Sequence, residues 1–274
     1  MNDAFDPQAT EDEASSKSQY LNLKDVRTLG IVMVVLVILL IPIYNMGRRN
    51  SEKARCTQNF KSMFDAINLY AKDHDDGLPP LYVIGEGGVP MVDGKGHPYT
   101  WVSDAAAYMN QRANFECPSA QPGEAVVVQS PTGGPPIVST YGMYTPYGGV
   151  KTFNIDSVDT TVLLSETSNE KANDTFDPKS FRNDGIAIGW DDDNFQSTLS
   201  SATVTRLAFH GSGSGNFKDA IGRHDGRDEA GPYTGVHALT ASGELIVLRP
   251  SNAKIQKRPD KLPGGLWNVP SLRK

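Results

Sequence analysis

The stretch TLGIVMVVLVILLIPIYNMG, residues 28–47, decides the architecture of this chain. It carries no charged residue and lies between Arg27 and the pair Arg48-Arg49. A helix of this length spans roughly 30 Å, the thickness of the hydrocarbon core of a bilayer. A soluble core helix would have a polar face, which the centre of this stretch lacks. We therefore predict a transmembrane helix over 26–48. A cleaved secretory signal is disfavoured, because the run is long and no small-x-small site follows it.

Composition divides the rest of the chain into four segments. Residues 1–25 are polar and acidic and predict a disordered tail. Residues 49–77 predict an amphipathic helical stem, 78–250 a β-rich globular head, and 251–274 a basic, proline-rich tail. The 26 Gly and 18 Pro indicate many turns, and the net charge of −6 argues against nucleic-acid binding. The predicted class is α+β, with the long helix packed on an antiparallel β-rich head.

The stem has an apolar stripe at three- and four-residue spacing, formed by Phe60, Phe64, Ile67 and Ala71. Lys53, Lys61 and Lys72 fall between these positions. We expect the stripe to face the β-sheet of the head. The alternative is a free-standing stem that uses the stripe to pack on other subunits.

Within the head, residues 101–110 predict a short helix and several short apolar runs predict strands. The strand candidates are 125–128, 161–165, 185–190, 204–209, 236–240 and 244–248. The last two are joined by a turn ending at Gly243 and predict a hairpin. Residues 211–235 are rich in glycine and predict a long loop.

Two observations bear on compartment. The only cysteines, Cys56 and Cys117, would be bridged outside the cytoplasm, and the alternative is a pair of buried free thiols. The positive charges that follow residue 47 would, by the positive-inside rule alone, place the head in the cytoplasm. These two indications oppose each other.

Several motifs occur in a fixed order along the chain. They are Pro42, CTQNFK at 56–61, YAKDHDDGLPP at 70–80, CPS at 117–119, HDG at 224–226 and VHALTASGEL at 236–245. This set resembles the type IV pilins and pseudopilins, and most closely the DUF1559 family of prepilin-type proteins with a C-terminal H-X9-DG motif. The resemblance places a prepilin cleavage bond between Tyr20 and Leu21. Because Tyr20 stands where the family has glycine, we predict that the chain is not cleaved there.

The resemblance implies a bacterial inner-membrane protein with a cytoplasmic N-terminus and a periplasmic head. It implies a structural or assembly role, with like subunits or a secretion- or pilus-type assembly as partners. The alternative is a membrane-tethered binding module for a ligand or partner. No recognisable motif supplies an activated nucleophile or base, so we predict neither an enzyme nor a bound cofactor.

Two groups of site residues are candidates. Asp184, Asp191 and Asp193 are closely spaced oxygen donors that suit calcium, and the alternative is a solvated acidic loop. His224, in the family motif, is expected to hold the loop to the hairpin, with ligand binding as the alternative. Cys56, Cys117, Pro42 and Gly243 are expected to be structural.

Overall fold

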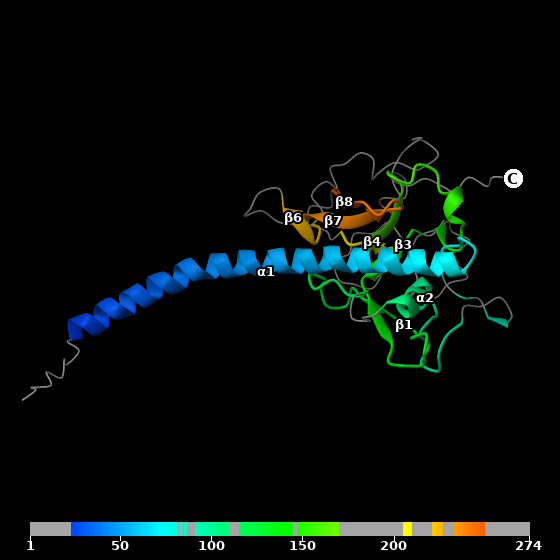
Figure 1. The fold of residues 1–274 in the computed structure, drawn as a ribbon. Helices are drawn as coiled ribbons and strands as arrows, with labels where there is room; N and C mark the ends of the chain where they lie inside the picture. Colours follow the sequence, from blue (N-terminus) through cyan, green and yellow to red (C-terminus); the bar gives the residue numbers. More distant parts are fainter. Residues whose placement is uncertain are drawn as a thin grey trace, which may run out of the picture. The chain divides into compact units, whose positions relative to one another are not determined.

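The computed structural model describes residues 23–81, 83, 85–86, 91–109, 115–144, 147–169, 205–209, 221–226 and 233–249. Most of the N-terminal tail, the strand candidate 185–190, the calcium candidates Asp184, Asp191 and Asp193, and the C-terminal tail lie outside these ranges. The fold is α+β, as predicted: a long N-terminal helix is followed by a short helix and antiparallel strands (Figure 1). The chain separates into two units, residues 1–48 and 49–274.

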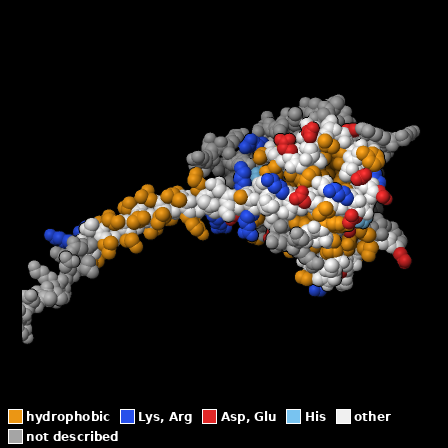
Figure 2. Space-filling model, in the orientation of Figure 1, with side chains coloured by type: hydrophobic (Ala, Val, Ile, Leu, Met, Phe, Trp, Pro, Cys, Tyr) orange, Lys and Arg blue, Asp and Glu red, His pale blue; other side chains and the backbone are white. Residues whose placement is uncertain are grey.

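Helix α1 (Leu23–Asp73) contains Pro42 and belongs to both units. In the first unit, the large apolar side chains from Val26 to Met46 are 46–71% exposed. In Figure 2 hydrophobic side chains recur along the visible face of this segment, with backbone and other atoms visible between them. Its charged residues lie at its ends, and the helix is long and apolar enough to cross a membrane.

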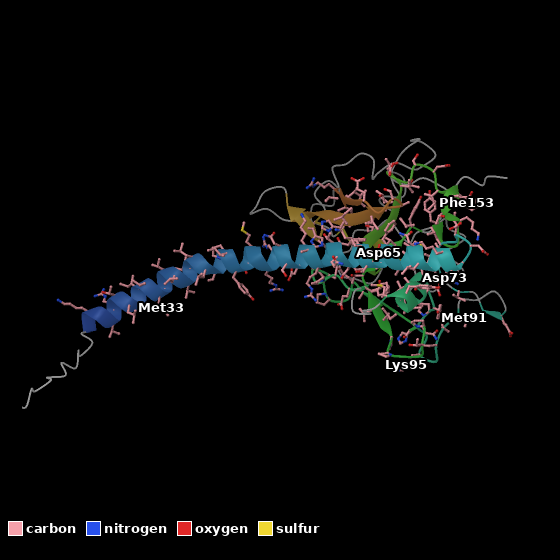
Figure 3. The ribbon with its side chains drawn as sticks, in the orientation of Figure 1. Met33, Asp65, Asp73, Met91, Lys95 and Phe153 are labelled. Atoms are coloured by element: carbon pink, nitrogen blue, oxygen red, sulfur yellow. A yellow bond between two sulfur atoms is a disulfide. The ribbon has the colours of Figure 1, made fainter. Side chains whose placement is uncertain are left out.

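In the second unit, α1 supplies part of the hydrophobic core. Phe60, Ile67 and Ala71 are buried and Phe64 is half-buried against the core, which confirms the predicted stripe and contradicts the free-standing stem. Lys61 and Lys72 are exposed, whereas Lys53 is half-buried. Asp65, also exposed, is labelled on α1 in Figure 3.

Helix α1 ends at Asp73, four residues before the predicted end of the stem at Gly77, and a turn follows it. Asp75 and Asp76 have φ angles of 52° and 61°, and the Asp76 amide donates to the Ala71 carbonyl at 2.8 Å. Aspartate tolerates this left-handed conformation. Gly77 then forms an antiparallel bridge with Lys151.

Within the described residues, the strands form two antiparallel sheets. In the larger, the order is β3 (Tyr141–Met143), β4 (Val162–Asn169), β7 (Tyr233–Thr240), β6 (His224–Gly226). In addition, β5 (Thr205–Leu207) pairs with β4, and β8 (Leu245–Leu248) pairs with β7. A separate ribbon is formed by β1 (Val126–Val128) and β2 (Ile137–Ser139). The central strands β4 and β7 therefore bring distant parts of the chain together.

Most sequence predictions in the described part of the head are confirmed. The predicted helix is α2 (Trp101–Tyr108), capped by Thr100, and the predicted hairpin is β7–β8. The prediction of a long loop over 211–235 is wrong in part, because β6 and the start of β7 lie within it. The three residues of β6 have no alternating apolar pattern, and their strand conformation comes from pairing with β7.

Gly243 closes the β7–β8 turn with φ +87°, and a Cβ there would lie 2.6 Å from Cε1 of Phe64. Gly243→Ala is therefore expected to lower the free energy of unfolding by about 2 kcal/mol, combining left-handed strain with overpacking. Gly123→Ala is the matched control, because Gly123 has φ +89° with open space around it. It should cost only the strain, about 1 kcal/mol. Urea denaturation compares the two, and equal losses would contradict the packing of Phe64 on this turn.

Candidate functional site: a buried polar cluster at the disulfide

A disulfide joins Cys56 of α1 to Cys117, with the two Cα atoms 5.2 Å apart. The bridge confirms the first of the two alternatives for this pair and leaves no free cysteine. Both residues are almost completely buried. The Cys117 amide donates to Thr140 Oγ1 at 2.8 Å. The residue before β3 is therefore connected, through Cys117 and the disulfide, to α1.

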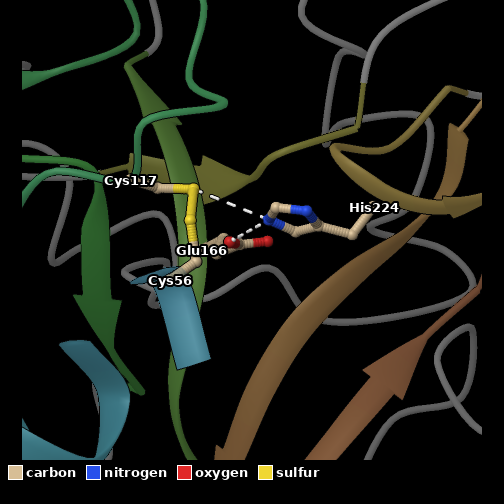
Figure 4. A group of neighbouring side chains, drawn as sticks. All are labelled: Cys56, Cys117, Glu166 and His224. Carbon is tan, nitrogen blue, oxygen red and sulfur yellow. Dashed lines mark hydrogen bonds and ion pairs between the residues drawn. A yellow bond between two sulfur atoms is a disulfide. The ribbon is translucent and has the colours of Figure 1, made fainter. Parts of the chain in front are cut away.

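A histidine and a glutamate lie directly beside this bridge (Figure 4). His224 Nε2 is 2.8 Å from Glu166 Oε1 and 3.5 Å from Cys117 Sγ. Glu166 comes from β4 and His224 from β6, and the two strands flank β7 in the sheet. We call Cys56, Cys117, Glu166 and His224 the Cys–Glu–His cluster.

Strand β7 supports the cluster from between the two flanking strands. The His237 amide donates to Glu166 Oε2 at 2.9 Å, so both carboxylate oxygens are bonded. The imidazole of His237 stacks on that of His224, with ring centroids 4.3 Å apart. These contacts hold the His224 ring and the Glu166 carboxylate in fixed orientations.

Arg223 adds a second buried ion pair next to the cluster. Its Nη2 atom is 2.8 Å from Glu124 Oε2 and 2.7 Å from the Thr167 carbonyl. Its Nη1 atom donates to the Thr140 carbonyl at 3.3 Å. Arg223 therefore links the loop before β1 to the residue that precedes β3 and to strand β4 itself.

The electrostatics of the site keep Glu166 ionised and Tyr141 neutral. Burial raises the pKa of the Glu166 carboxyl, but the hydrogen bond from His224 and the charges of His224, Arg223 and His237 outweigh it, so the net shift is downward. Burial, reinforced by the nearby Glu166 charge, raises the pKa of the Tyr141 phenol. Tyr141 accepts a hydrogen bond from Asn59 Nδ2 at 3.2 Å.

The arrangement brings together one acid–base pair and two sulfur atoms in a solvent-excluded position. All four residues of the Cys–Glu–His cluster are at most 3% exposed, and their candidate ligand atoms lie within 4.8 Å of one another. In the disulfide state, the cluster links α1 covalently to the segment at Cys117, and the contact between Glu166 and His224 links β4 to β6.

His224 lies on strand β6, which pairs with the hairpin strand β7, and not in the loop that the sequence predicted. Sequence analysis missed its partners Glu166, Arg223 and His237. One signal was available: Glu166 lies two residues after the short apolar run 162–164, directly after the predicted strand 161–165, and a buried carboxylate needs partners. Gly243 closes the hairpin turn and Pro42 lies inside α1.

No protein-family model matches the chain. No significant match was found among curated proteins or among solved structures.

Proposed function

We propose that this protein is a pilin- or pseudopilin-like envelope protein, anchored in the bacterial inner membrane by α1, with a structural or assembly role. The observation that supports this most strongly is the division of α1. One half is apolar on all sides and exposed, and the other half is a core helix of the second unit. The same helix therefore supplies both a candidate membrane anchor and part of the core of the folded unit.

The proposed topology places residues 1–25 in the cytoplasm and the second unit in the periplasm. A disulfide persists in oxidising compartments, and Cys56–Cys117 supports that side for the second unit. Lys24 and Arg27 supply positive charge on the proposed inner side. Arg48 and Arg49 oppose this orientation under the positive-inside rule, so the disulfide is the deciding argument.

The packing of the stem limits how like subunits associate. Phe60, Ile67 and Ala71 are used inside the second unit and are not available to a neighbour. Association would therefore use the exposed apolar side chains between Val26 and Met46. In a bilayer, such helices associate through van der Waals packing and hydrogen bonds between helices.

A membrane-tethered binding module is the second candidate function. The same packing favours it, because a stem whose apolar stripe is buried in its own domain serves to fix that domain in place. In this case the protein stays monomeric in the membrane and its partner binds the second unit.

Three variants of the full chain in its native membrane test the proposal, each with one cysteine added to the bridged pair Cys56–Cys117. Val34→Cys is expected to form a disulfide-linked dimer on mild oxidation, because 26–48 is the proposed contact. Lys61→Cys, at an exposed position of the second unit, should react with a membrane-impermeant maleimide in spheroplasts. Ser16→Cys should react only after lysis, and its presence in the purified protein shows that Tyr20–Leu21 is intact.

Each variant has its own contradicting result. A monomeric Val34→Cys protein, with Lys61→Cys labelled as expected, would favour the tethered binding module. Labelling of Ser16→Cys but not of Lys61→Cys in spheroplasts would show the opposite orientation, with the N-terminus in the periplasm and the second unit in the cytoplasm. Loss of the residue-16 cysteine from the mature protein, with a methylated amine at Leu21, would show prepilin-type processing.

A further inference from the structure

The Cys–Glu–His cluster contains the donor set of a metal centre as well as a disulfide. We propose that, when the disulfide is reduced, this cluster binds one zinc ion through Cys56 Sγ, Cys117 Sγ, Glu166 and His224 Nε2. The same four residues would thus form a cross-link in two exclusive states, one covalent and one through the metal. The proposal rests on the second unit alone and does not depend on membrane anchoring or assembly.

The distances in the cluster are close to those of a tetrahedral zinc site. Zinc lies about 2.3 Å from thiolate sulfur and about 2.0–2.2 Å from imidazole nitrogen or carboxylate oxygen. Tetrahedral angles then separate sulfur from nitrogen by about 3.6 Å and nitrogen from oxygen by about 3.4 Å. The observed Cys117 Sγ–His224 Nε2 distance is 3.5 Å, and Nε2 is 2.8 Å from Glu166 Oε1. The sulfur–nitrogen pair already has the tetrahedral separation, whereas the nitrogen–oxygen pair must open by about 0.6 Å and the two sulfurs must move apart once their bond is broken.

The donor types select zinc among the common divalent ions. Two thiolates exclude magnesium and calcium, which take oxygen ligands, and imidazole with thiolate suits zinc. Four protein ligands close the coordination sphere, which is the pattern of a structural zinc site. The ligands come from α1, the segment at Cys117, β4 and β6. A bound zinc would therefore link the same parts of the fold as the disulfide.

The surroundings already orient two of the four ligands. Glu166 Oε2 is held by the His237 amide at 2.9 Å, which leaves Oε1 directed at His224 Nε2. The stacked His237 ring fixes the plane of the His224 imidazole. Bonds of this type, made to the ligands of a metal, keep those ligands in place for coordination. The buried guanidinium of Arg223, which is paired with Glu124, lies close enough to the cluster to lower the pKa of the Glu166 carboxyl, and so favours the charged carboxylate that zinc needs.

The change of state balances with a named reductant. A water-soluble phosphine reduces the sulfur–sulfur bond with two electrons and one water, giving a phosphine oxide and two thiols. Zinc then displaces both thiol protons. The displaced protons pass to the solvent buffer. Zinc binds the unprotonated Nε2 atom of a neutral His224 ring, whose single proton is then on Nδ1, and Glu166 Oε1 gives up its contact with Nε2 to bind the metal.

The experiment measures zinc and cobalt binding to the full-length protein in detergent. After reduction by the phosphine, zinc is added and the unbound metal is removed by desalting. We expect one zinc per chain in the reduced protein and none in the oxidised protein. Cobalt in place of zinc should give tetrahedral d–d bands and a thiolate-to-cobalt charge-transfer band. A reduced protein that retains no zinc, or an oxidised protein that retains as much, would overturn the proposal.

Two variants and one control assign the ligands. Glu166→Gln and His224→Gln are each expected to weaken zinc binding by on the order of 100-fold and to alter the cobalt spectrum. His97→Gln is the matched control, because His97 forms a similar 2.8 Å pair with Asp93 at the partly exposed surface. Formation of the Cys56–Cys117 bridge on oxidation checks that each variant has folded. A folded His224→Gln protein that binds zinc as the natural protein does would refute the assignment.

Discussion

Replacing Arg223 with leucine is expected to lower the free energy of unfolding by about 3–5 kcal/mol, the usual cost of removing one partner of a buried ion pair. Arg223 is 4% exposed and Glu124 is 1% exposed. The substitution leaves the Glu124 carboxylate in a solvent-excluded position without the charge that stabilises it. It also removes hydrogen bonds to the carbonyls of Thr140 and Thr167.

A double variant separates the charge from the packing. Arg223→Leu combined with Glu124→Leu removes both charges and should be less destabilised than Arg223→Leu alone, because no uncompensated carboxylate remains. It will not recover fully, since the Gln121 amide loses its bond to Glu124 Oε2. Urea denaturation of the full chain in detergent, monitored by near-ultraviolet circular dichroism, gives the free energy of unfolding of the natural protein, the single variant and the double variant. A loss below about 1 kcal/mol for Arg223→Leu would mean that water reaches the pair.

The two regular features of the fold were predictable because each has a period. The stripe at Phe60, Phe64, Ile67 and Ala71 repeats with the helix, and the β7–β8 hairpin has two apolar runs around a glycine turn. Short strands such as β3 and β6 carry no such period. Their conformation comes from pairing with neighbours that are distant in sequence, so local pattern could not identify them.

The candidate site was predictable only at its motif residues. Cys56, Cys117 and His224 stand out as residue types or as part of a motif. Glu166 is a single charge after a short apolar run, and Arg223 is one of several charges in the segment RHDGRDE at 223–229. Their importance depends on burial, which here results from sheet order. Because β4 and β6 both pair with β7, residues 58 positions apart in the chain form one ion pair.

Removing the disulfide is the second change that we expect to lower the free energy of unfolding strongly. The bridge closes a loop with a sequence separation of 61, for which the chain-entropy model gives roughly 4 kcal/mol of stabilisation. The double variant Cys56→Ala, Cys117→Ala should lose about this amount, measured by the same denaturation assay. If the double variant has the same circular dichroism spectrum at zero urea as at high urea, it is unfolded without denaturant. The loss would then exceed the total stability of the domain.

Added zinc separates two effects on stability: the loss of the sulfur–sulfur bond alone, and the loss of every link between residues 56 and 117. Zinc at 100 times its dissociation constant would stabilise the reduced natural protein by about 2.7 kcal/mol, because a ligand that binds only the native state shifts unfolding. The double-alanine variant lacks both thiolates and should not respond. Equal responses in the two proteins would place zinc elsewhere on the chain. If neither responds, and the reduced natural protein is as unstable as the double-alanine variant, the covalent bond alone holds α1 to the segment at Cys117.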